Sequence, residues 1–162
     1  MADAGGKLVS VRDEHGNLKI AECTHEFDAR LEEMKIAGEE GATMICPCFS
    51  DGERYLCNEA YRLGFPVITL RNMGFNRFEK PVGKLFDRCA EGKLLYLAPI
   101  AWAYQNAKKP LTRLDGVALN RIAQLLVGGE NPRPINYKGM VPERIDEYVH
   151  EITLPQLGGI LV

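Results

Sequence analysis

The chain has 162 residues, which is enough for one domain with a sizeable hydrophobic core. Its 20 basic and 22 acidic residues leave a formal charge of -2, which excludes a protein that holds nucleic acid mainly through overall positive charge. No apolar run approaches the roughly 20 residues that cross a bilayer, and the N-terminus lacks a signal-peptide pattern. We therefore expect a cytoplasmic protein that makes no membrane contact and keeps its five cysteines as thiols.

Residues 8–11 and 18–21 are short apolar-rich runs on either side of a polar turn at 13–17. This pattern predicts a hairpin, or an edge strand followed by the first central strand of a sheet. The apolar residues between Glu26 and Glu40 then recur at helical spacing, so this segment is predicted to be a helix that ends at Gly41.

Three short apolar runs follow, and each stops at a turn-rich loop that opens a helix. They predict strands at residues 42–46, 66–70 and 93–98. Strands that are apolar on both faces and alternate with helices are typical of a parallel sheet covered on both sides. The predicted fold class is therefore α/β, as a Rossmann-like three-layer α/β/α arrangement. Its mostly parallel sheet is expected to have four or five strands, with these three as neighbours.

The helices of this alternation carry local start and stop signals. Ser50-Asp51-Gly52-Glu53 matches a capping box, and Gly64 is the expected stop of the helix that it begins. A short helix is predicted at residues 84–90. Thr112-Arg113-Leu114-Asp115 is a second box of similar type, and it begins an amphipathic helix that Gly128 ends.

The composition changes after Gly129, because Asn131-Pro132-Arg133-Pro134 cannot continue a helix. Beyond it we expect a short helix at 142–150 and an extended apolar tail at 152–162. The predicted organisation is a Rossmann-like domain over residues 1–130, which includes the N-terminal hairpin or edge strands at 1–24, and a C-terminal extension over residues 131–162.

The loop after the strand at 42–46 is the best candidate for a binding site, because ligands of parallel sheets bind outside the carboxyl ends of the strands. The helix N-terminus that follows this loop suits a phosphate, and Ser50 and Gly52 would permit a close approach. Asp51 and Glu53 would repel that phosphate. The alternative is that Ser50 and Glu53 only cap the helix, and the pattern favours this alternative by about two to one.

Residues 71–93 form the basic stretch of the chain, with two phenylalanines, Phe75 and Phe78, among the charges. Basic side chains with aromatics can follow a phosphate backbone and stack on bases. A solvated loop anchored by two phenylalanines explains the pattern equally well. With the capping-box loop, this stretch and the second box give the predicted ligand-binding residues: Ser50, Asp51, Gly52, Glu53, Lys80, Lys84 and Arg113.

Cys46-Pro47-Cys48 suggests a metal site, but structural zinc usually takes four ligands in wider paired spacings. We therefore expect no metal and no cofactor, and Cys46 is interpreted as a core residue. Trp102, the one tryptophan, follows the strand at 93–98. It could stack on a base at the edge of a binding site, act as a hydrophobic plug, or form a dimer contact.

Residues 41–126 resemble a known family, through the runs Gly-Ala-Thr-Met-Ile-Cys-Pro-Cys-Phe-Ser-Asp-Gly-Glu, Gly-Phe-Pro-Val-Ile-Thr-Leu and Gly-Lys-Leu-Leu-Tyr-Leu-Ala-Pro. They are similar to the Rossmann-like domain of DNA-processing (DprA/Smf-type) proteins, and more closely to an uncharacterised relative in Bacteroides-type bacteria. The resemblance implies a bacterial domain that binds a nucleotide or DNA. The chain lacks the glycine-rich phosphate loops of that family and of the related lysine-decarboxylase-like family, so no catalytic residue is carried over.

Three functions follow as hypotheses. The first is a binding module for a nucleotide or single-stranded nucleic acid at the carboxyl edge of the sheet. The second is a small nucleotide-processing hydrolase that uses Glu53 or Asp51 as general acid or base, and the third is a purely structural or interaction domain. The sequence favours the first over the second and barely separates the first from the third, and it leans against an enzyme. Trp102 and the apolar tail at 152–162 further predict a homodimer.

Overall fold

The computed structural model describes residues 9–12, 18–22, 25–48, 50–75, 81–102, 110–128 and 134–154. The chain forms two compact units, and both are discontinuous in sequence. The first comprises Met1–Met44 and Cys48–Val67, and the second comprises Ile45–Pro47 and Ile68–Val162. Among the helices of the described residues, none is both long enough and apolar enough to cross a membrane.

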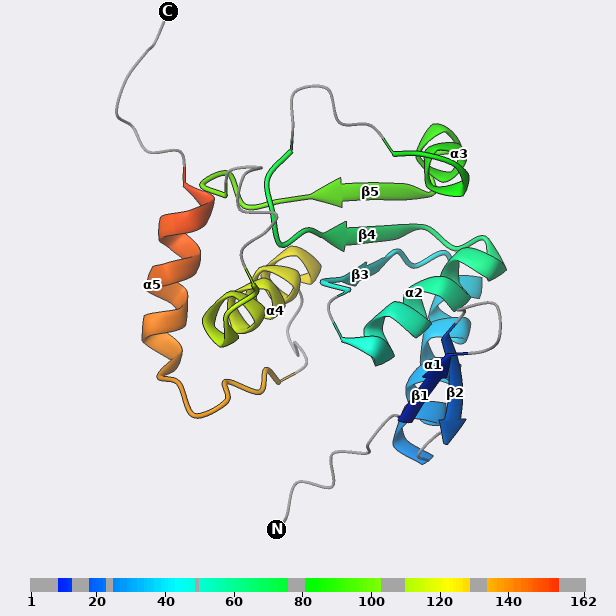
Figure 1. The fold of residues 1–162 in the computed structure, drawn as a ribbon, viewed down its shortest axis with the longest axis horizontal. Helices are drawn as coiled ribbons and strands as arrows, with labels where there is room; N and C mark the ends of the chain where they lie inside the picture. Colours follow the sequence, from blue (N-terminus) through cyan, green and yellow to red (C-terminus); the bar gives the residue numbers. More distant parts are fainter. Residues whose placement is uncertain are drawn as a thin grey trace, which may run out of the picture. The chain divides into compact units, whose positions relative to one another are not determined.

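The predicted strands form one parallel sheet. Strands β3 (Met44–Cys46), β4 (Val67–Leu70) and β5 (Leu94–Leu97) lie side by side in the order β3-β4-β5 and run in the same direction (Figure 1). The α/β fold class and the adjacency of these strands are confirmed. The predicted number of strands is wrong for the described residues, in which the parallel sheet has three strands rather than four or five.

The N-terminal strands pair with each other instead of joining that sheet. Strands β1 (Val9–Arg12) and β2 (Leu18–Glu22) are antiparallel neighbours in a sheet of their own. The hairpin alternative is therefore correct. A short connection returns the chain antiparallel to the preceding strand, whereas a parallel neighbour needs a crossover of about a dozen residues or more.

Two helices dominate the first unit, α1 (His25–Glu39) and α2 (Asp51–Leu63), and they pack against each other. Helix α2 ends as its sequence predicts, because Gly64 adopts a left-handed conformation with φ 78° that glycine tolerates at a helix end. Helix α1 makes a close approach to the chain after α2. A Cβ atom built on Gly38 would lie 2.3 Å from Cδ2 of the Phe65 ring.

The second unit holds helices α3 (Lys84–Ala90), α4 (Arg113–Val127) and α5 (Pro142–Thr153). Helices α4 and α5 pack together around a buried cluster, which consists of Val117, Ala118, Ile145, Val149 and Ile152. The predicted boundary between residues 130 and 131 stays a prediction, although the helices on its two sides pack together in one unit.

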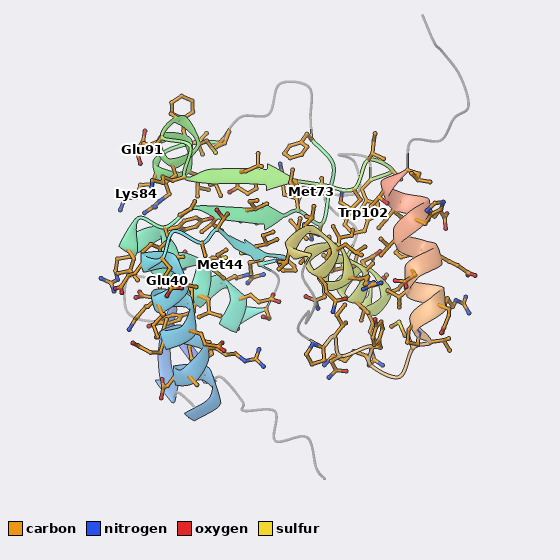
Figure 2. The ribbon with its side chains drawn as sticks, turned by 180° about the vertical axis from the view of Figure 1, so that it is seen from behind. Glu40, Met44, Met73, Lys84, Glu91 and Trp102 are labelled. Atoms are coloured by element: carbon orange, nitrogen blue, oxygen red, sulfur yellow. The ribbon has the colours of Figure 1, made fainter. Side chains whose placement is uncertain are left out.

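The structure corrects two premises of the predicted dimer. Helix α5 extends to Thr153, so Ile152 belongs to the buried cluster rather than to an extended tail. Trp102 packs against the same cluster beside α4 and α5 (Figure 2), as the hydrophobic-plug alternative predicts. Residues 155–162 of the predicted tail lie outside the described residues. The dimer itself stays a prediction.

Polar contacts also join α4 to α5. The Tyr148 hydroxyl donates to Oδ1 of Asp115 at 2.7 Å, and Arg121 donates to both carboxylate oxygens of Asp146, with Nε 2.6 Å from Oδ1. Burial, aided by the hydrogen bond to Asp115, raises the pKa of Tyr148 from 10.0 to about 12. Tyr148 therefore remains a protonated donor at neutral pH.

Replacing Tyr148 with phenylalanine should lower the free energy of unfolding at pH 7 by about 1–2 kcal/mol, because a hydrogen bond to a carboxylate is lost. The folded protein keeps the Tyr148 proton up to a higher pH than the unfolded chain, so the stability of the wild type should fall as the pH rises from 10 towards 12. Urea unfolding at pH 7 and between pH 10 and 11.5 measures both effects. An equal dependence on pH in wild type and Tyr148→Phe would contradict this role of Tyr148.

Candidate functional site

The predicted site at the start of α2 is a helix cap. The backbone N–H of Glu53 donates to Oγ of Ser50 at 3.2 Å, and the N–H of Ser50 donates to Oε2 of Glu53 at 2.9 Å. These two bonds satisfy N–H groups that a phosphate at this helix end would otherwise use. The contacts therefore favour the capping alternative for Ser50 and Glu53.

The acids at this helix end are also engaged with a neighbouring side chain. Arg54 lies with Nη1 3.5 Å from Oδ1 of Asp51, and its Nε donates to the carbonyl oxygen of Cys48 at 3.3 Å. Asp51 and Glu53 place two negative charges in the first turn of α2, where they stabilise the helix dipole. This arrangement stabilises the start of α2.

The described basic residues of the predicted site lie in the second unit, at the starts of two helices. Arg113 is the first residue of α4, beside a second capping box in which Thr112 and Asp115 exchange hydrogen bonds. Lys80 lies outside the described residues. Lys84 begins α3, which contacts β5.

Figure 2 shows Lys84 near the start of β5, whereas Met73, which follows β4, lies near the carboxyl end of the strands. Helix α3 has seven residues and is therefore only about 10 Å long. Helix α3 itself lies near the amino end of β5. Lys84 is for this reason not part of the carboxyl edge of the sheet.

A different basic residue lies at the carboxyl edge. Arg71 directly follows β4, and its backbone N–H donates to the carbonyl oxygen of Leu97, the last residue of β5, at 2.7 Å. This bond continues the ladder between the two strands beyond the end of β4. It fixes the backbone of Arg71 beside the end of β5, where a parallel sheet presents its ligand-binding loops.

The Arg71 side chain stacks with two aromatic rings. Its Cζ atom lies 4.9 Å from the centroid of Phe75 and 5.7 Å from the centroid of Tyr96 on β5. We call these three residues the Arg71 cluster. Phe75 is 50% exposed, and Arg71 and Tyr96 are half-buried. The cluster therefore combines a positive charge with an accessible aromatic ring.

The chemistry of this cluster suits an anion that carries an aromatic group. The face of a guanidinium can contact aromatic rings, while its N–H donors lie in its plane and match the oxygens of a phosphate. An exposed phenylalanine ring is a platform on which a base can stack. The Arg71 cluster thus offers both kinds of contact within one short segment of the sheet edge.

Sequence reasoning found this cluster only in part. It places Arg71 and Phe75 in the basic stretch at 71–93, but it names neither of them as ligand-binding, and it does not consider Tyr96. The available signal is positional. Arg71 is the first polar residue after one predicted strand, and Tyr96 lies in the next strand, which is the neighbour in the sheet.

The cysteines are placed partly as expected. Cys46 is buried in β3, with 3% of its surface exposed, which confirms its interpretation as a core residue. Cys48 lies beyond the end of that strand, with Sγ 2.7 Å from Sγ of Cys57 in α2. This proximity was not predicted, because α2 brings together two cysteines that are nine residues apart.

Comparison of the chain with protein-family models, with curated proteins and with solved structures finds no match. The resemblance to DNA-processing proteins thus gains no support from these comparisons. The findings support a small α/β domain with a three-stranded parallel sheet.

Proposed function

We propose that this domain binds a nucleotide or single-stranded nucleic acid through the Arg71 cluster at the carboxyl edge of the sheet. The observation that carries the proposal is the stacking of Arg71 with Phe75 and Tyr96 where β4 and β5 end. The guanidinium would bind a phosphate, and Phe75 would stack on a base. The net charge of -2 supports a local contact rather than a broad basic surface.

A nucleotide-processing hydrolase is the weaker candidate. The acids that it would use, Asp51 and Glu53, bond to Arg54 and to the backbone of Ser50. A general acid or base must instead reach the proton that it transfers. We therefore propose a binding function without catalysis.

The proposal predicts that Phe75→Ala weakens binding about fivefold or more, because loss of one stacked base costs about 1–3 kcal/mol. The matched control is Phe86→Ala, since Phe86 on α3 is also 50% exposed but lies outside the cluster. Fluorescence anisotropy with a labelled oligothymidine, and calorimetric titration with ATP, measure the two ligand classes separately. Equal affinities of the two variants would contradict the role of Phe75.

The charge of Arg71 is tested in the same way. Arg71→Ala should reduce the slope of log affinity against log salt for the oligonucleotide by about 0.7, the value for one phosphate contact to a single strand. Lys84→Ala, which removes an exposed charge at the amino end of β5, should leave the slope unchanged. A wild-type protein that binds neither ligand at millimolar concentration would refute the binding function and leave the structural or interaction domain as the alternative.

A further inference from the structure

Two thiols meet beside the N-terminus of α2. Cys48 lies two residues before Ser50, the N-cap residue of α2, and Cys57 lies within the helix. Their Sγ atoms are 2.7 Å apart, well inside the van der Waals separation of two sulfur atoms, and the structure contains both as thiols.

The two thiols differ in access. Cys57 is buried, with 2% of its surface exposed, whereas Cys48 is half-buried. Cys48 also has a φ of 57°, a left-handed conformation that residues other than glycine rarely adopt. Such conformations persist where the surrounding structure imposes them, and they are concentrated at functional sites. Nε of Arg54 donates to the carbonyl oxygen of Cys48 at 3.3 Å, which helps to hold the backbone of this residue in place.

We propose that Cys48 and Cys57 form a redox-active site that exchanges with low-molecular-weight disulfides. The Cys48 thiolate attacks one sulfur of the external disulfide, which forms a mixed disulfide and releases one thiolate. The Cys57 thiolate then attacks Sγ of Cys48, which forms the Cys48–Cys57 disulfide and releases the second thiolate. One external disulfide is reduced to two thiols, and one protein dithiol is oxidised to a disulfide.

The distance between the thiols favours this chemistry over metal binding. Two thiolates that share a tetrahedral zinc ion lie about 3.7 Å apart, because each Zn–S bond is about 2.3 Å long. The observed Sγ–Sγ distance of 2.7 Å is a whole ångström shorter. The two sulfur atoms are thus closer together than two ligands of one zinc ion.

The test titrates the reduced full chain with mixtures of oxidised and reduced glutathione. After each mixture is quenched with N-ethylmaleimide, mass spectrometry should show two fewer alkylated cysteines, and peptide mapping should link Cys48 to Cys57. The link should form at a roughly tenfold lower ratio of oxidised to reduced glutathione than a mixed disulfide on Cys89 of α3, because the second thiol of the pair is held at high effective concentration. Cys57→Ser should retain one glutathione on Cys48, since no thiol displaces it.

Three results would overturn the proposal. The first is a link from Cys48 or Cys57 to another cysteine, such as Cys46, and Cys46→Ala serves as the control that should keep the predicted link. The second is that Cys48 and Cys57 are still alkylated at ratios of oxidised to reduced glutathione that already place glutathione on Cys89. The third is protection of both thiols by one equivalent of zinc. If Cys57→Ser does not fold, the peptide map of the wild type and the variant Cys48→Ser still test the proposal. Cys48→Ser should lose the link, and its Cys57 should carry no glutathione.

Discussion

Replacing Ile145 with alanine should lower the free energy of unfolding by about 2–5 kcal/mol. Ile145 has 0% of its surface exposed and lies in the buried cluster between α4 and α5, with Val117 and Val149 among its members. The substitution removes buried methyl and methylene groups and leaves a cavity that these helices can fill only in part. Urea unfolding followed by circular dichroism measures the loss.

Two further variants show whether burial is the cause. Ile145→Val removes one methylene from the same place and should cost about 0.5–1.5 kcal/mol. Val127→Ala, at the end of α4 where Val127 is 66% exposed, should change the stability by no more than about 0.5 kcal/mol. An Ile145→Ala protein as stable as Val127→Ala would mean that the packing of α5 on α4 is not as described.

Gly38→Ala should destabilise the first unit by about 1–3 kcal/mol, against the usual preference for alanine in a helix. Gly38 lies in α1, and a Cβ atom there would be 2.3, 2.4 and 2.6 Å from three atoms of the Phe65 ring. Atoms cannot approach so closely, so the ring or the helix must shift. Thermal unfolding and urea unfolding of the wild type and the variant measure the cost.

The sign of the Gly38→Ala effect should reverse when the ring is absent. In a Phe65→Ala background the clash is removed, and Gly38→Ala should then stabilise the protein by up to about 1 kcal/mol through helix propensity. The four proteins form a double-mutant cycle whose coupling energy isolates the contact between residues 38 and 65. A destabilising effect of equal size in both backgrounds would show that the Phe65 ring is not what excludes a side chain at Gly38.

Local signals in the sequence predict local structure well here. The capping residues Ser50 and Glu53 and the stop residue Gly64 place α2 within a residue of its ends, and α3 is predicted with its observed bounds. The end of α5 was misplaced although its signal is present, since Ile145, Val149 and Ile152 recur at helical spacing through the last turn. Ile152 is instead predicted from the sequence as the first residue of the extended tail.

Contacts between residues far apart in sequence were not predicted. Arg71 and Tyr96 are brought together by the pairing of β4 with β5, and Cys48 and Cys57 by the turn that leads into α2. For the first contact the sequence offers only the positional signal of two neighbouring predicted strands, and for the second it offers none. The helix cap at Ser50 illustrates the opposite case, because the same residues suggest a phosphate site and a cap, and only the distances between their atoms favour the cap.

The discontinuity of the two units limits how this protein can be dissected. A single cut between residues 67 and 68 separates Ile68–Val162 from Ile45–Pro47, which carries two of the three residues of β3. In such a fragment β4 would lose one of its two neighbours and become an edge strand, with unpaired backbone groups that invite aggregation. A soluble fragment with the Arg71 cluster must therefore begin before β3, and it then also carries α2 of the first unit.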